Sequence, residues 1–144
     1  MSAGVTMAFG RKIAERIARG GVLLLEGELG AGKTTFVQGL AEGLGITQRL
    51  TSPTFALMNV YPVTHTTITH LVHVDLYRLT STDSLSELDL DHWLSDPSAL
   101  LVVEWPERSA SAWSNVIGKI RFSSGDNIAL RELAAEGDVV DLLQ

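Results

Sequence analysis

The sequence predicts an α/β fold, with a mixed, mainly parallel sheet flanked by helices. Short apolar runs of strand length, at 22–26 and 100–104, alternate with longer amphipathic segments. A glycine-rich loop joins the first run directly to a segment with helical periodicity. The chain has 144 residues, of which 45% are hydrophobic and 19% charged, a balance that suits one compact domain. We therefore expect a single domain spanning residues 1–144.

The first elements follow from local patterns. Residues 9–20 predict an amphipathic helix, because Phe9, Ile13 and Ile17 fall on one face and glycines follow at the end. Residues 22–26 are β-prone and too short for a helix, and the segment 33–44 reads as a helix ended by glycine. This order of strand, glycine loop and helix is the context of a phosphate-binding loop.

The middle of the chain predicts a hairpin. Two extended segments, 54–62 and 67–79, are joined by a polar turn around 63–67, which favours an antiparallel pair. The later elements expected are a short helix over 81–94, a buried strand over 100–104, a helical turn over 109–113 and a strand over 116–124. The tail, 127–144, is ambiguous between helix and strand. Antiparallel strands are thus added to a parallel nucleus.

The stretch GELGAGKT, residues 27–34, has the spacing G-x-x-x-x-G-K-[ST] of the Walker A phosphate loop. Its glycines let the backbone curl so that N–H groups point at the β-phosphate, where the helix dipole also favours negative charge. Lys33 is expected to reach the β- and γ-phosphate oxygens, and the Thr34 hydroxyl to bind Mg²⁺. The nucleotide-binding residues predicted here are Gly27, Glu28, Leu29, Gly30, Ala31, Gly32, Lys33, Thr34 and Thr35. A loop that binds nothing is disfavoured by the flanking pattern, so we expect a P-loop NTPase-like fold.

Two acids stand at the ends of apolar strands. A phosphate loop needs a second carboxylate there, to hold magnesium or to orient the attacking water. We assign Glu104 to Mg²⁺ and Asp75 to the water or to sensing the γ-phosphate, and the reverse assignment stays open. His73 shares the strand face of Asp75, but a lone histidine on a half-apolar strand is interpreted as structural, not catalytic.

Composition excludes several classes of function. Eleven basic against 17 acidic residues give a net charge of -6, so bulk electrostatics do not favour nucleic acid or anionic lipid, and any RNA contact is local or indirect. The absence of cysteine excludes disulfides and thiolate zinc sites and fits a reducing compartment. The longest apolar runs are far below the roughly 20 residues of a membrane span, and the N-terminus lacks a signal-like apolar stretch. We expect a cytoplasmic protein without membrane contact.

Four motifs together resemble the TsaE (YjeE-like) ATPases, which take part in threonylcarbamoyladenosine synthesis on tRNA. These motifs are GELGAGKTTF, TSPTFALMNVY, HVDLYRL and EWPER, at residues 27–36, 51–61, 73–79 and 104–108. The phosphate loop is shared by very many proteins, but the other three motifs in this order are not. The resemblance covers about residues 6–108 and is thin beyond 119, and Glu28 stands where an aspartate is commoner.

The resemblance implies roles for individual residues. The segment Thr51, Ser52, Pro53 and Thr54 corresponds to a switch with hydroxyls near the γ-phosphate, of which Thr54 is a catalytic candidate beside Asp75 and Lys33. Asp75 matches the acid of the family's H-x-D-x-Y-R motif. Glu104 and Trp105 match its E-W motif, where the glutamate meets magnesium and the tryptophan supports the site. Thr6 falls near the adenine side of the pocket.

The resemblance also implies partners. It indicates a Mg²⁺-dependent ATPase subunit that acts on TsaB and TsaD type transferase subunits and meets tRNA only indirectly; alone, the chain is expected to be monomeric. Hydrolysis by the chain alone should be slow, because no confident arginine finger is found; Arg78 and Arg108 are the nearest candidates.

Three other readings stay open. A GTPase should carry N-K-x-D and D-x-x-G motifs; neither occurs, which favours ATP. A small-molecule or nucleotide kinase uses the same loop but normally needs an arginine-bearing lid, and none is evident. The third alternative is a nucleotide-dependent interaction module, in which hydrolysis only resets binding. It overlaps with the family interpretation, because the resemblance also implies a subunit that acts on partner proteins.

Overall fold

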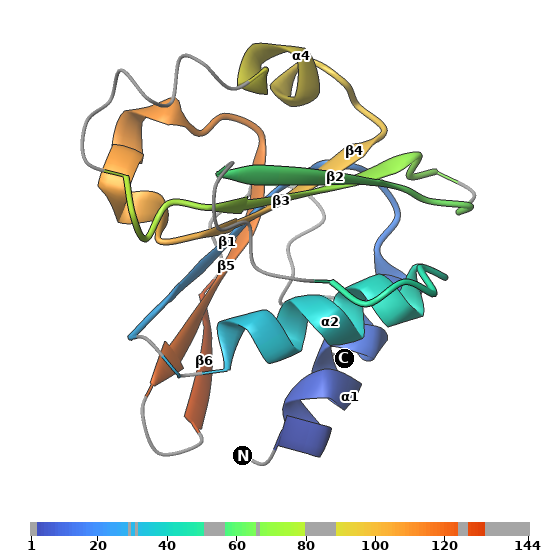
Figure 1. Ribbon diagram of the computed structural model, residues 1–144, viewed down its shortest axis with the longest axis vertical. Helices are drawn as coiled ribbons and strands as arrows, with labels where there is room; N and C mark the ends of the chain where they lie inside the picture. Colours follow the sequence, from blue (N-terminus) through green and yellow to red (C-terminus); the bar gives the residue numbers. More distant parts are fainter. Residues whose placement is uncertain are drawn as a thin grey trace.

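The predicted α/β architecture is confirmed by a computed structural model, which describes residues 3–28, 30, 32–50, 57–65, 67–79, 89–123 and 127–131 (Figure 1). Its elements are α1 (Ala3–Arg16), β1 (Gly21–Gly27), α2 (Lys33–Gly43), β2 (Met58–Pro62), β3 (His70–Asp75), α4 (Leu90–Leu94), β4 (Ala99–Glu104), the 3₁₀ helix η1 (Pro106–Ala112), β5 (Val116–Ser123) and β6 (Asn127–Arg131). They form one six-stranded sheet in the order β2-β3-β4-β1-β5-β6.

The sheet has a parallel nucleus with an antiparallel strand at each side. Strands β3, β4, β1 and β5 run parallel, whereas β2 pairs antiparallel with β3 and β6 antiparallel with β5. Strand β1 is central, and Leu25 pairs with Glu104 on β4. The carboxyl ends of the parallel strands therefore meet at one edge, where the glycine-rich loop begins.

Most predicted elements are found, with shifted bounds. The hairpin of β2 and β3 and the buried strands β1, β4 and β5 match the expectation. The predicted helix over 81–94 is described only at its end, as α4, since residues 80–88 lie outside the described chain. The ambiguous tail opens with β6. The first helix was placed too late, because α1 already begins at Ala3 and ends at Arg16.

Alternate residues of the strands build a core on each face of the sheet. Figure 1 shows α1 and α2 together on one side and α4 on the other. The face toward α1 and α2 buries Leu23, Leu25, Leu71, Leu100 and Val102 with Ile13, Phe36 and Leu40. The opposite face buries Val22, Leu24, Val72, Val74, Leu101 and Val103 with Leu90. This period of two puts Asp75 and Glu104 on the α2 side of the sheet.

Helices α1 and α2 touch backbone to backbone. A Cβ atom at Gly39 would lie 2.1 Å from the Met7 carbonyl oxygen, and one at Gly10 would lie 2.4 Å from the Phe36 carbonyl oxygen. Both distances are far below van der Waals contact. Glycine at these two positions is thus what allows α1 to lie directly against α2.

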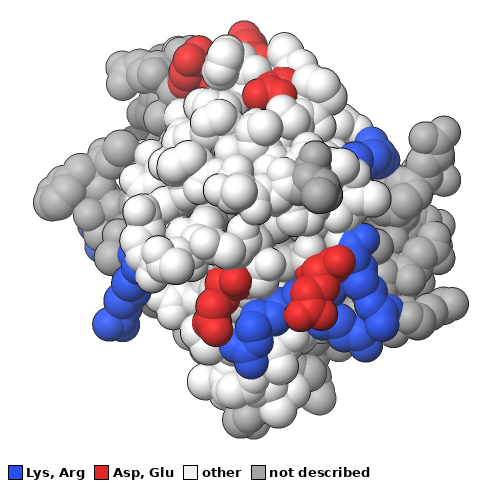
Figure 2. Space-filling model, turned by 90° about the vertical axis from the view of Figure 1, so that its right-hand side faces the viewer, with Lys and Arg blue, Asp and Glu red and all other residues white. Residues whose placement is uncertain are grey.

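Charge on the helical side is mixed. Figure 2 shows acidic and basic side chains next to one another across the lower half of the face in view, and acidic side chains alone at its top. An exposed pair joins α1 to α2, with Arg11 Nη1 3.4 Å from Glu42 Oε1. Within the described ranges, no helix combines the length and the apolar character that crossing a bilayer requires.

Candidate functional site

The glycine-rich loop leaves the end of β1 and enters α2 through left-handed backbone conformations. Gly27, Gly30 and Gly32 have φ values of 146°, 80° and 104°. A Cβ at Gly27 would also lie 2.4 Å from the Phe122 carbonyl oxygen, so glycine is needed there for space as well as for conformation. Glu28 follows β1 with an exposed side chain, whereas Leu29 and Ala31 lie outside the described residues.

The first turn of α2 faces a cavity at the carboxyl edge of the sheet. Gly32 is its N-cap and provides no side-chain cap, so the first N–H groups of the helix are left for other acceptors. The cavity has a volume of about 220 Å³ and is lined by Gly30, Gly32, Lys33, Thr34, Thr35, Asp75, Tyr77, Glu104 and Trp105. The fold thereby joins both strand-end acids to the loop and to the start of a helix, where backbone N–H groups lack partners within the helix and favour anions.

Lys33 is more enclosed than a lysine reaching into an open pocket. It is only 4% exposed, its Nζ donates to the Gly27 carbonyl oxygen, and it lies 3.7 Å from the ring centroid of Trp105. Burial lowers the pKa of Lys33, and the negative charges of Glu104, Glu107 and Asp75 partly oppose this shift. A phosphate at the loop would supply the strong counter-charge that this amine lacks.

The two carboxylates have different surroundings. Asp75 is half-buried, and its Oδ1 accepts a hydrogen bond from the Tyr77 backbone N–H at 3.0 Å. Burial raises the pKa of Asp75; the Tyr77 N–H opposes the rise, and the charge of Glu104 adds to it. Glu104 is buried, and its Oε2 lies 2.6 Å from Nε2 of His73. The chain thus sets a more exposed acid beside a buried, histidine-bound one.

Sequence reasoning treated His73 as structural and missed its contact with Glu104. The histidine is indeed fully buried, with 0% exposure. Alternation of side chains along β3 puts His73 on the same face as Asp75. Its contact with Glu104 depends on the pairing of β3 with β4, which aligns Asp75 with Glu104. No local sequence pattern carries that information.

Trp105 holds three side chains around the site. Its backbone is left-handed, with φ 60°, a conformation that a bulky residue adopts only when its surroundings impose it. The indole contacts Lys33, lies 5.1 Å from the Tyr77 ring and lies 5.7 Å from Arg108 Cζ. Tyr77 was not predicted to lie here. The Arg108 guanidinium, considered above as a finger, lies over the indole ring.

Thr6 reaches the loop from α1. It is buried, and a Cβ on Gly32 would lie 3.7 Å from its Cγ2. The remaining predicted residues, Thr51, Ser52 and Thr54, lie outside the described chain. Thr6 therefore lies beside Gly32 of the loop, on the side where Phe122 of β5 also approaches it.

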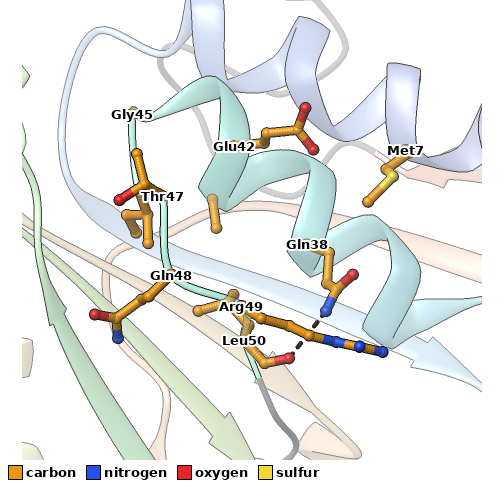
Figure 3. Close-up of a pocket in the computed structure, with 10 residues that line it drawn as sticks. Met7, Gln38, Glu42, Gly45, Thr47, Gln48, Arg49 and Leu50 are labelled. Atoms are coloured by element: carbon orange, nitrogen blue, oxygen red, sulfur yellow. Dashed lines mark hydrogen bonds between the residues drawn. The ribbon is translucent and has the colours of Figure 1, made fainter.

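Two further cavities suit phosphate less well. One, of about 360 Å³, surrounds the C-terminal end of α2, where Gln38 donates to the Leu50 carbonyl oxygen at 2.9 Å and Glu42 lies nearby (Figure 3). Helix C-termini carry partial negative charge, which disfavours anions. The other, of about 430 Å³, is lined by Glu26, Gly27, Glu28, Trp105, Glu107, Arg121 and Phe122, mostly acids among its charged groups. The N-terminal end of α2 is the better phosphate site.

The oxygen donors at this site fit magnesium. Thr34, Asp75 and Glu104 line the same cavity and offer a hydroxyl and two carboxylates, which are hard ligands. In the part of the chain that the structure describes, no group of three or more His, Cys, Asp or Glu side chains could hold a metal ion. A cation held by one or two protein groups, phosphate oxygens and water remains compatible with this donor set.

Comparison with known proteins agrees with this geometry. Residues 1–132 match the family model described as "Threonylcarbamoyl adenosine biosynthesis protein TsaE". The tRNA threonylcarbamoyladenosine biosynthesis protein TsaE of Streptomyces coelicolor is 43% identical over 133 residues, covering 92% of this chain and 81% of the relative. That of Bacillus subtilis is 43% identical over 100 residues, covering 69% and 60%.

A solved structure agrees as well. Bacillus subtilis YdiB superposes with a TM-score of 0.69 at 30% identity, over 90% of this chain and 80% of that one. The chain has a P-loop NTPase fold, with the glycine-rich loop at the end of its central strand β1. Both features agree with the family match over residues 1–132. The chain therefore belongs to the TsaE family of tRNA threonylcarbamoyladenosine biosynthesis proteins.

Proposed function

We propose that this chain is a Mg²⁺-dependent ATPase that supports threonylcarbamoyladenosine formation at the adenosine next to the anticodon, by acting on the TsaB and TsaD type transferase subunits. The observation that carries the proposal is one cavity that joins the phosphate loop and Lys33 to Asp75 and Glu104. Membership of the TsaE family is our reason for coupling this ATPase to threonylcarbamoyladenosine synthesis on tRNA.

The loop and the start of α2 bind the phosphates in this proposal. On the Walker A spacing of residues 27–34, we assign the backbone N–H groups of the loop to the β-phosphate and Lys33 to the β- and γ-phosphate oxygens. Thr6 flanks the nucleotide from α1 at the adenine side. Trp105 holds the Lys33 amine in place through the cation–π contact at 3.7 Å.

The Thr34 hydroxyl and the Glu104 carboxylate would hold magnesium. When bound, it supplies positive charge to the γ-phosphate, where negative charge is redistributed during transfer. Asp75 orients the attacking water and accepts its proton. Its raised pKa, caused mainly by burial, makes it a better base than an ordinary aspartate.

The switch residues complete the γ-phosphate side. We assign Thr51 and Ser52 to contacts with the nucleotide and Thr54 to the catalytic group, on the resemblance of residues 51–61 to the family's switch motif. Hydroxyl groups at this place would report whether a γ-phosphate is present.

Coupling to partner subunits is supported by the lining of the cavity, which includes no arginine among the described residues. Arg108, close to the cavity, lies over Trp105, 5.7 Å from the ring, and serves that ring instead of the γ-phosphate. A cation supplied in trans can raise turnover by roughly 10³ or more. We propose that TsaB or TsaD completes the catalytic set, that the chain is a cytoplasmic monomer when alone, and that its net charge of -6 keeps tRNA contact indirect.

The test is steady-state phosphate release from ATP by the purified chain, alone and with the TsaB and TsaD subunits, together with formation of modified adenosine in tRNA. We expect slow release alone, stimulation by the partners, and loss of both activities in Lys33→Met. Lys12→Met, which changes an exposed lysine of α1, is the control and should release phosphate from ATP like wild type when the chain is assayed alone. Fast release by the chain alone, or stoichiometric transfer to a small acceptor, would favour a self-sufficient hydrolase or a kinase.

A further inference from the structure

The buried contact between His73 and Glu104 links two parallel strands beneath the cavity. Nε2 of His73 lies 2.6 Å from Oε2 of Glu104, and the two residues are 0% and 3% exposed. Both side chains stand on the α2 face of the sheet, because they lie two residues beyond Leu71 and Val102, which pack on that face. The distance is short even for a hydrogen bond to a charged acceptor.

The other ring nitrogen identifies the tautomer. Nδ1 of His73 is buried and has no hydrogen-bond partner among the described residues. A proton on Nδ1 would be a buried donor without an acceptor, which costs more than a lone pair left in apolar surroundings. The proton therefore belongs on Nε2, where it is donated to the Glu104 carboxylate.

This donor fixes one oxygen of a carboxylate that lines the cavity. The terminal torsion of a glutamate is broad, so a carboxylate without a partner samples many orientations. With Oε2 engaged by the histidine, Oε1 is the oxygen left to face the cavity that Glu104 lines. Partners of this kind behind a metal ligand typically change metal affinity by about 10- to 100-fold.

We infer that His73 is a positioning residue: its Nε2–H holds the Glu104 carboxylate in the orientation that binds Mg²⁺ beside the phosphate loop. The inference rests on the proposed function, in which Glu104 is a magnesium ligand. His73 itself touches neither nucleotide nor metal in this arrangement.

Two substitutions of similar size separate the hydrogen bond from packing. His73→Gln keeps an N–H donor near the place of Nε2, whereas His73→Met fills similar space without one. The measurement is the Mg²⁺ concentration that half-maximally tightens binding of a non-hydrolysable ATP analogue. We expect a rise of about tenfold or more for His73→Met, a value within a few-fold of wild type for His73→Gln, and no change for Leu71→Met, a buried control on the same strand face.

A second readout needs no nucleotide, metal or variant. Long-range ¹H–¹⁵N NMR correlations of the metal-free wild-type protein report the histidine tautomer directly. We expect the His73 proton on Nε2 and a lone pair on Nδ1. A proton on Nδ1 alone would overturn the inference even if His73→Met failed to fold.

The outcomes distinguish this inference from the proposed function. If wild-type protein binds the analogue with a clear Mg²⁺ requirement and folded His73→Met shares it unchanged, the inference is overturned and the ATPase proposal survives. Equal rises for the Gln and Met variants would also overturn it, since packing would then explain both. Wild-type binding that ignores Mg²⁺ would overturn the magnesium role of Glu104 in the proposed function, and the inference with it.

Discussion

Asp75 and Glu104 occupy paired positions at the ends of the neighbouring parallel strands β3 and β4. The pairing places two carboxylates side by side at the edge where the phosphate loop begins. Their partners differ, because Asp75 accepts a hydrogen bond from the Tyr77 backbone whereas Glu104 is buried against His73. Neighbouring acids with unlike environments are suited to different tasks.

Near-isosteric substitutions of these two acids should therefore impair different steps, one Mg²⁺-dependent nucleotide binding and the other hydrolysis. We expect Glu104→Gln to raise the Mg²⁺ concentration needed for tight ATP binding by about tenfold or more, because a metal ligand loses its charge. Asp75→Asn should spare binding and lower turnover by about 10² or more, as for loss of a general base. Titration of a non-hydrolysable analogue with Mg²⁺, and single-turnover hydrolysis, measure the two effects. The opposite pattern would exchange the assigned roles.

Removing the buried lysine should separate stability from nucleotide binding. Because burial lowers the pKa of Lys33, its charged form is disfavoured in the folded protein. This cost is full below the folded pKa and is relieved as pH rises from that value toward the ordinary pKa of 10.5. Lys33→Met should thus keep or raise the melting temperature at neutral pH while weakening ATP binding by about tenfold or more. Thermal unfolding and ATP titration, with Lys12→Met as control, test both parts. A folded Lys33→Met with wild-type affinity would contradict the phosphate-loop assignment.

Asp75 should make folding stability depend on pH in the acidic range. Its pKa is raised in the folded state above the ordinary value of 3.8, so the folded protein keeps this proton after the unfolded chain has lost it. The contribution of Asp75 to stability therefore falls as pH rises through that window. We expect Asp75→Asn to gain stability relative to wild type as pH rises above about 4, as measured by urea unfolding at several pH values. A relative loss over the same range would show that the pKa is lowered instead.

ATP should bind more tightly than GTP. The sequence carries no N-K-x-D motif to read guanine, and Thr6 flanks the loop on the proposed adenine side. Competition between the two nucleotides for a fluorescent ATP analogue, at fixed Mg²⁺, gives the ratio of dissociation constants. A clear preference for GTP would remove the adenine assignment and favour the GTPase alternative.

The parts of the site that sequence predicted best are local. The loop at Gly27 and Gly32 needs glycine for backbone reasons, and the acids Asp75 and Glu104 end apolar strands. Such features can be read within a few residues. Parallel pairing of β3 and β4 then brings the two strand ends together, which is why acids some thirty positions apart in sequence lie at one edge.

The parts that sequence missed depend on contacts between elements. The register of β3 against β4 sets the partner of His73. Tyr77 and Arg108 group around Trp105 because the backbone of this tryptophan is left-handed, a conformation that its side chain does not predict. The enclosure of Lys33 likewise follows from packing against Trp105. The start of α1 was placed late because its early residues lack a continuous apolar face.

Helices α1 and α2 should move as one rigid body, because their backbones are in direct contact at Gly10 and Gly39. Sliding α1 along α2 by one turn would bring side chains against the backbone where Gly10 and Gly39 now allow direct contact, and no Cβ fits there. Any shift of α2 that follows phosphate binding at its first turn must therefore carry α1 with it. The exposed outer surface of α1, far from the phosphates in sequence, would move with the occupancy of the loop, so that a subunit resting on it could sense the nucleotide without touching it.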